Sequence, residues 1–111
     1  MLAFCALCYS AQAQTAKELV GRWKLVKHTK DGKDEPIKED TYQVFAENGK
    51  FTGIVGSKSS TGKWRLSDDG KELTVKVSIV KVKFVVESFD AQHRVISSES
   101  LGTLEYEKVP D

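Results

Sequence analysis

Short segments that alternate apolar and polar residues, separated by turn-forming residues, constrain the fold of this chain more than any other feature. The clearest segment, residues 72–78, places Leu73, Val75 and Val77 on one face, and residues 80–88 repeat the pattern. Such alternation predicts antiparallel strands with one buried and one solvated face. Beyond the first few residues of the domain, no window shows the periodicity of a helix.

The same pattern predicts eight short strands along the chain. They cover residues 21–29, 41–47, 51–56, 61–66, 72–78, 80–88, 92–98 and 101–108. Asn48-Gly49 predicts a hairpin with a type I′ turn, in which both residues have positive φ. Ser57–Ser60 and Asp68–Gly70 predict two further turns, and the polar stretch Lys30–Asp40 is the longest loop.

Strands joined mostly by hairpin-length loops predict an up-and-down meander. Because an open meander exposes two edges, we expect closure into a barrel through pairing of the first and last strands. Thr15 and Glu18 form a capping box, which predicts one helical turn before the first strand. The expected fold is therefore all-β, an antiparallel barrel of about eight short strands with a short N-terminal helical turn.

The beginning of the chain has the features of a secretory signal. Residues 2–8 are apolar, no charged residue precedes Lys17, and Ala11-Gln12-Ala13 fits a signal-peptidase site. We expect residues 1–13 to be a signal peptide and residues 14–111 to be a secreted or periplasmic domain. The usual basic start is missing, which suggests an upstream start or a truncated gene model. A buried helix is the alternative, and the run is shorter than the ~20 residues of a membrane span.

Both cysteines of the chain, Cys5 and Cys8, fall within the predicted signal. A lipid-anchored cysteine needs a small residue before it, whereas Phe4 and Leu7 precede these two. We therefore expect no lipid anchor and a domain that is stabilised by its core rather than by disulfides.

Charge and motif content exclude several classes of function. The formal net charge is +1, with acidic and basic residues mixed along the chain, which argues against a nucleic-acid platform. His28 and His93 lack the spacing of metal ligands, and no nucleophile elbow or phosphate-binding glycine loop is present. We therefore expect no catalytic residue, no metal and no cofactor.

Two segments of the chain echo each other. Residues 21–25 read Gly-Arg-Trp-Lys-Leu, and residues 62–66 read Gly-Lys-Trp-Arg-Leu. We interpret them as two strands whose side chains pack in the same way. The glycine admits a neighbouring group, the tryptophan enters the core and the cations face water.

The order of three motifs, at residues 19–25, 45–51 and 62–66, resembles the small lipocalin-like proteins of the calycin superfamily that Bacteroides-type bacteria secrete. The resemblance implies that Gly21, Trp23 and Lys108 close one end of the barrel and that the Lys30–Asp40 loop lies over the open mouth. Lys108 takes the place of an arginine that lipocalins often stack on this tryptophan. Lipocalins also share a second motif, Thr-Asp-Tyr, of which this chain has at best Asp90, in Phe89-Asp90-Ala91.

The resemblance implies non-catalytic binding of a small apolar molecule. Phe51, Trp64, Phe84 and Tyr106 are the expected lining of its cavity. The main alternative is an interaction module of the cell envelope with a barrel filled by its own side chains. Its outer face would contact another envelope protein or a second copy of the chain, as in a homodimer. An unusual enzyme or inhibitor that uses His28 or His93, and a nucleic-acid-binding OB-fold, are weaker alternatives.

Overall fold

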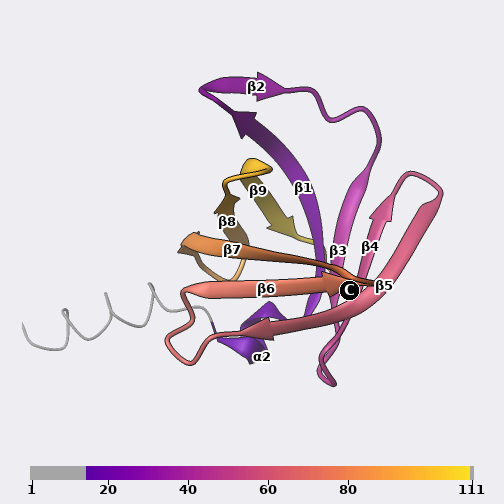
Figure 1. Cartoon of the computed structure of the whole chain (residues 1–111), viewed down its shortest axis with the longest axis vertical. Helices are drawn as coiled ribbons and strands as arrows, with labels where there is room; N and C mark the ends of the chain where they lie inside the picture. The colour runs from indigo at the N-terminus through magenta and orange to yellow at the C-terminus, as the bar shows by residue number, and fades with distance from the viewer. Residues whose placement is uncertain (1–14, 111) are drawn as a thin grey trace, which may run out of the picture.

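The computed structural model describes residues 15–110. One short helix, α2 (Ala16–Leu19), precedes nine strands (Figure 1). The strands are β1 (Gly21–Lys30), β2 (Lys33–Glu35), β3 (Thr41–Phe45), β4 (Lys50–Val55), β5 (Lys58–Leu66), β6 (Glu72–Val77), β7 (Val80–Phe89), β8 (His93–Ser98) and β9 (Gly102–Lys108). The predicted signal peptide lies outside the described residues. Within them, no helix is long and apolar enough to cross a membrane.

Eight of the strands form a closed antiparallel barrel. Each strand from β3 to β8 pairs with the next, and β1 pairs with both β3 and β9. In the closing pair, Trp23 lies opposite Lys108 and Leu25 opposite Tyr106, before a bulge at Val26. The predicted all-β barrel, including the pairing of its first and last strands, is confirmed.

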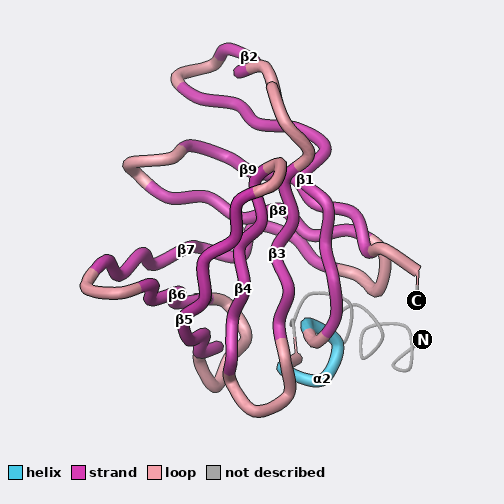
Figure 2. Tube along the Cα trace, turned by 90° about the vertical axis from the view of Figure 1, so that its right-hand side faces the viewer, coloured by secondary structure: helices cyan, strands magenta, loops and turns pink. Residues whose placement is uncertain are grey.

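The loop predicted at Lys30–Asp40 contains a strand that the sequence analysis missed. Asp31 and Gly32 both have positive φ, and they turn the chain so that β2 pairs with the end of β1. Figures 1 and 2 show this hairpin standing beyond the ends of the neighbouring strands. An Asp-Gly pair is as strong a hairpin signal as Asn-Gly, so the sequence did contain the evidence.

The hairpin at Asn48-Gly49 is present, but its predicted turn type is wrong. Gly49 has a φ of 87°, whereas Asn48 is not among the residues with positive φ. The Gly49 N–H donates to the Ala46 carbonyl, and the Asn48 side chain accepts from the Lys50 N–H. The turn is therefore a type I turn followed by a glycine in the left-handed region. Asn48 stabilises it as an Asx turn and does not need positive φ.

The predicted turn at Ser57–Ser60 is shorter than expected. Gly56, with a φ of 61°, lets the chain reverse at once, so that Lys58 already lies opposite Val55. Strand β5 therefore begins three residues earlier than predicted. The remaining predicted strand positions agree with the structure to within about two residues at each end.

The barrel has two different ends. The β3–β4 turn lies at the same end as α2 (Figure 2). The buried core concentrates toward this closed end. It consists of Leu19, Trp23, Leu25, Phe45, Phe51, Leu73, Val75, Phe84, Phe89, Ile96, Leu104 and Tyr106. Toward the opposite end the strands continue as hairpins with exposed apolar residues, among them Val55, Ile79, Val80 and Leu101.

Candidate functional site

The closed end is built around Trp23. Its side chain is fully buried, and its indole Nε1 donates to the Leu19 carbonyl at 2.9 Å, which ties β1 to the end of α2. The Lys108 Nζ lies 5.0 Å from the centre of the Trp23 ring and donates to the Val20 carbonyl at 3.0 Å. Lys108 thus combines a cation–π contact with a hydrogen bond to the backbone.

Gly21 is required where this lysine passes. The residue has a φ of +130°, and a Cβ there would lie 2.6 Å from the Lys108 Cε. In the echoed segment, a Cβ at Gly62 would collide with the backbone carbonyl of Lys76. Each glycine therefore admits a neighbouring group, a side chain in one case and a backbone in the other.

Arg94, on β8, occupies the centre of the closed half of the barrel. Its side chain is 0% exposed, and its guanidinium carbon lies 4.9 Å from the Trp23 ring centre, 5.1 Å from that of Phe45 and 4.5 Å from that of Tyr106. Its Nη2 donates to the Gln43 Oε1 at 2.7 Å. Three aromatic rings and one amide therefore surround a single cation.

Burial shifts the pKa values of the two titratable groups of this cluster, Arg94 and Tyr106. It lowers the pKa of Arg94 to about 10, and it raises the pKa of Tyr106 to about 12 although the nearby Arg94 charge opposes that change. Arg94 is therefore positively charged at neutral pH. Its Nε and Nη1 have no hydrogen-bond partner, and no carboxylate among residues 15–110 forms an ion pair with it. The electron-rich ring faces are its principal compensation for lost water.

Three of the four residues predicted to line a ligand cavity lie in the packed core. Phe51, Phe84 and Tyr106 are all buried, and the Phe51 ring packs edge-on against Phe45 at 5.3 Å. They belong to the same core cluster, and Tyr106 stacks on Arg94. The closed half of the barrel is thus filled by its own side chains.

Trp64 differs from the other three residues because it is only half-buried. Its Nε1 donates to the Ala46 carbonyl at 2.9 Å, and its ring meets Phe45 edge-on at 5.7 Å. It also lines an open hollow of about 500 Å³ beside α2, together with Ala16, Lys17, Val20 and Glu47. Trp64 is therefore the predicted site residue that reaches the surface.

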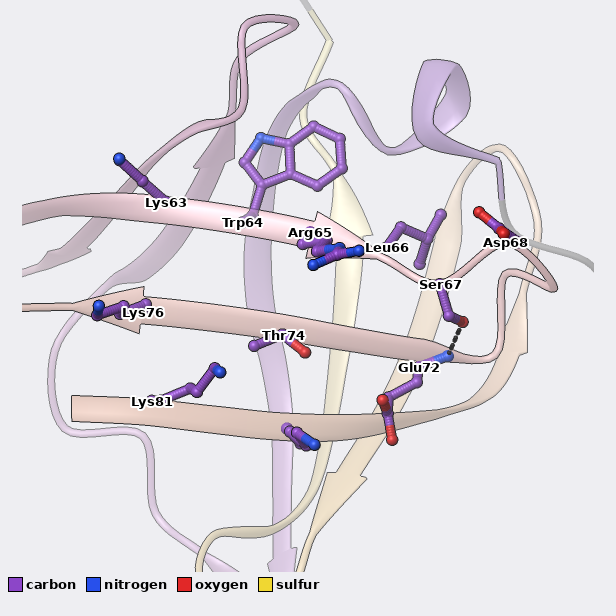
Figure 3. Close-up of a pocket in the computed structure, with 11 residues that line it drawn as sticks. Lys63, Trp64, Arg65, Leu66, Ser67, Asp68, Glu72, Thr74, Lys76 and Lys81 are labelled. Atoms are coloured by element: carbon purple, nitrogen blue, oxygen red, sulfur yellow. Dashed lines mark hydrogen bonds between the residues drawn. The ribbon is translucent and has the colours of Figure 1, made fainter. Parts of the chain in front are cut away.

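A larger open hollow, of about 620 Å³, lies on the outer face of β5, β6 and β7 (Figure 3). Its floor contains Thr74, and Ser67, Asp68 and Glu72 lie toward one end. Basic residues dominate the rest of this surface. We use the term basic face for the outward-pointing cations of β4 to β7, which are Lys50, Lys63, Arg65, Lys76, Lys81 and Lys83.

The two histidines lie apart. His28 Nε2 is 2.6 Å from the Leu101 carbonyl, while His93 Nδ1 is 3.4 Å from the carboxylate of its near neighbour Asp90. The Asp90 carboxylate accepts from the backbone N–H groups of Gln92 and His93, and these hydrogen bonds lower its pKa. Within residues 15–110, no three His, Cys, Asp or Glu side chains are grouped as metal ligands.

Neither Arg94 nor the basic face was predicted from the sequence. Arg94 alternates in phase with Ile96, which is buried, so the strand pattern did contain a signal for an inward-pointing cation. The basic face had no such signal in any single segment. It arises because the strand register places cations from four strands side by side.

Residues 8–100 match a protein family described as a C-terminal lipocalin-like domain. None of the curated proteins matches this chain.

Two solved structures with the same fold come from Bacteroides species. A lipocalin-like protein from Bacteroides uniformis is 21% identical, with a TM-score of 0.70 over 83% of this chain and 99% of its own. An uncharacterized protein from Bacteroides eggerthii is 18% identical, with a TM-score of 0.69 over 82% of this chain and 99% of its own. At these identities the likeness establishes the fold.

Proposed function

The chain belongs to the family of C-terminal lipocalin-like domains, and on this premise we propose that it is an exported, non-catalytic binding module. Its barrel serves as a packed scaffold, and its partners bind to the outside. This is the filled-barrel alternative from the sequence, and it now takes precedence over a ligand held inside the barrel.

The position of Arg94 supports this choice. A lipocalin-like cavity needs free volume between the strands, whereas here a fully buried guanidinium occupies the centre of the closed half. The rings of Trp23, Phe45 and Tyr106 enclose it, so a guest could enter this half only by displacing them. The two hollows described above, at Trp64 and on the basic face, both open on the exterior.

Binding of a small apolar molecule at the open end is the second candidate. Val55, Ile79, Val80 and Leu101 are exposed on the hairpins that surround this end, although large apolar side chains usually avoid water. An apolar group could rest on these residues without entering the filled half.

Native mass spectrometry of protein from its own host, with titration by the neutral apolar dye N-phenyl-1-naphthylamine, separates the two candidates. We expect no retained small molecule and no saturable dye uptake. Saturable uptake that Val80→Asp abolishes and Lys83→Gln preserves would reject the filled scaffold in favour of the second candidate. N-terminal sequencing of the secreted protein tests export, and we expect the mature chain to begin at Gln14.

A further inference from the structure

The basic face contains a row of like charges in register. Lys50 on β4 lies opposite Lys63 on β5, which lies opposite Lys76 on β6, which in turn lies opposite Lys81 on β7. Neighbouring strands are about 4.8 Å apart, so the row spans about 14 Å. A second row, Arg65, Thr74 and Lys83, runs beside the first.

This arrangement is unfavourable for the isolated protein. Like charges directly opposite each other on antiparallel strands destabilise the pair. None of the six cations forms an ion pair with a carboxylate in the part of the chain that the structure describes. On the seam between β1 and β9, by contrast, Lys24 lies opposite Glu107 and Lys27 opposite Glu105. The basic face therefore lacks the cross-strand carboxylates of the β1–β9 seam, and the acids Asp68 and Glu72 lie only toward one end of its hollow.

Exposed apolar side chains accompany these cations. Ile79, at the tip of the β6–β7 hairpin, is 92% exposed, and its neighbour Val80 is 60% exposed. Val85, two residues beyond Lys83 on the outer side of β7, is 52% exposed. Only the pair Val77 and Val80 separates the pair Lys76 and Lys81 from the turn, so apolar and basic groups lie on one hairpin.

We propose that the basic face and the tip of the β6–β7 hairpin dock on an anionic lipid surface, with Ile79 inserted at the level of the headgroups. Apolar side chains beside clustered cations fit a membrane interface, where burial and electrostatic attraction add together. A single-stranded nucleic acid would need exposed aromatic rings for stacking, whereas Phe84 is buried and the half-buried Trp64 ring packs edge-on against Phe45. The inference rests on the proposed outward-facing function.

Sedimentation with vesicles tests this inference on the folded domain. Vesicles of phosphatidylcholine mixed with phosphatidylglycerol should bind the protein, and vesicles of pure phosphatidylcholine should not. Binding should weaken as salt is raised, because the attraction is screened. The variant Lys76→Gln with Lys81→Gln should bind about 30-fold more weakly, since each cation near an anionic surface contributes about a fivefold gain in affinity.

The matched control is Lys24→Gln with Lys27→Gln, which makes the same change in net charge on the β1–β9 seam and should bind almost like the wild type. For the apolar part, Ile79→Asp should weaken binding, whereas Val26→Asp should have little effect. If the first double variant does not fold, Arg65→Gln with Lys83→Gln tests the second row in its place.

Equal losses of vesicle affinity in the two double variants would show that net charge alone drives binding. That result would overturn the assignment of binding to this face. So would the absence of binding to anionic vesicles. Binding to soluble heparin but not to vesicles would reject the lipid and indicate a soluble polyanion. None of these outcomes affects the test of the barrel interior, so failure of this inference is distinguishable from failure of the proposed function.

Discussion

The interior of the barrel and the basic face both hold positive charge without a carboxylate partner, but they stabilise that charge in different ways. Inside, Arg94 has no contact with water and depends on three aromatic rings and on Gln43. Outside, six cations are solvated, and their mutual repulsion is screened by water and salt. Disturbing the interior should therefore change stability strongly, whereas changes on the basic face should affect binding more than folding.

The largest effect is expected from Arg94→Ala. The substitution leaves a void between Trp23, Phe45 and Tyr106, and it should lower the free energy of unfolding by about 3 kcal/mol. Arg94→Met fills most of this volume without a charge and should stay within about 1 kcal/mol of the wild type. Urea denaturation measures both, with Arg65→Ala as the solvated control. Equal losses for alanine and methionine would show that charge matters more than volume.

The second-largest loss of stability is expected from Gln43→Leu, which removes the hydrogen-bond acceptor of Arg94. A charged donor left unpaired in the core should cost about 2 kcal/mol of stability. In the Arg94→Met background the same substitution should cost much less, because no charged donor remains. A double-mutant cycle by urea denaturation measures this coupling. Additive losses would contradict a direct interaction.

The raised pKa of Tyr106 predicts that this residue contributes a loss of stability at alkaline pH. Its folded pKa of about 12 lies above the ordinary tyrosine value of 10.0, so between these values the unfolded chain releases a proton that the native state retains. The contribution of Tyr106 to the free energy of unfolding should fall as pH rises through this range, by about 1.4 kcal/mol at pH 11. Arg94, whose pKa is lowered to about 10, contributes with the opposite sign in the same range, so the effect is the difference between the wild type and Tyr106→Phe. Tyr106→Phe should remove that contribution, whereas Tyr42→Phe should retain it. Parallel pH profiles for the wild type and Tyr106→Phe would refute the prediction.

The smallest effect is expected on the basic face. Lys76→Glu replaces repulsion from Lys63 and Lys81 by attraction and should raise the free energy of unfolding by about 0.5 kcal/mol at low salt. The gain should shrink as salt is added. Lys24→Glu on the seam should have the opposite sign, because it places two acids face to face. Thermal denaturation at two salt concentrations compares them, and a gain for both variants would contradict the contrast between these surfaces.

The barrel could be predicted from the sequence, but the distribution of charge on its surface could not. Alternation identified the inward positions of β6 and β7, because one buried face imposes a period of two on each strand. The Asp31-Gly32 hairpin was missed although its signal is local. The meeting of Lys63 with Lys76 depends on register between strands, which a single segment does not encode. Mixed charge along the chain therefore did not mean mixed charge on the surface.

The candidate site illustrates the same limit. Phe51, Phe84 and Tyr106 were predicted to line a cavity and are buried, but burial alone does not distinguish a cavity wall from a filled core. Arg94 decides between the two, and its effect depends on rings contributed by three other strands. That convergence can be seen only once the barrel is closed.

The closing pair β1–β9 joins the first strand of the domain to the last, and this determines when folding can finish. Until β9 has left the ribosome or the export channel, β1 keeps a row of unpaired backbone groups along the edge that β9 later covers. Contacts so distant in sequence form slowly. The interval before β9 arrives is therefore the period in which this chain is most exposed to aggregation, and a holding factor would have its greatest effect then.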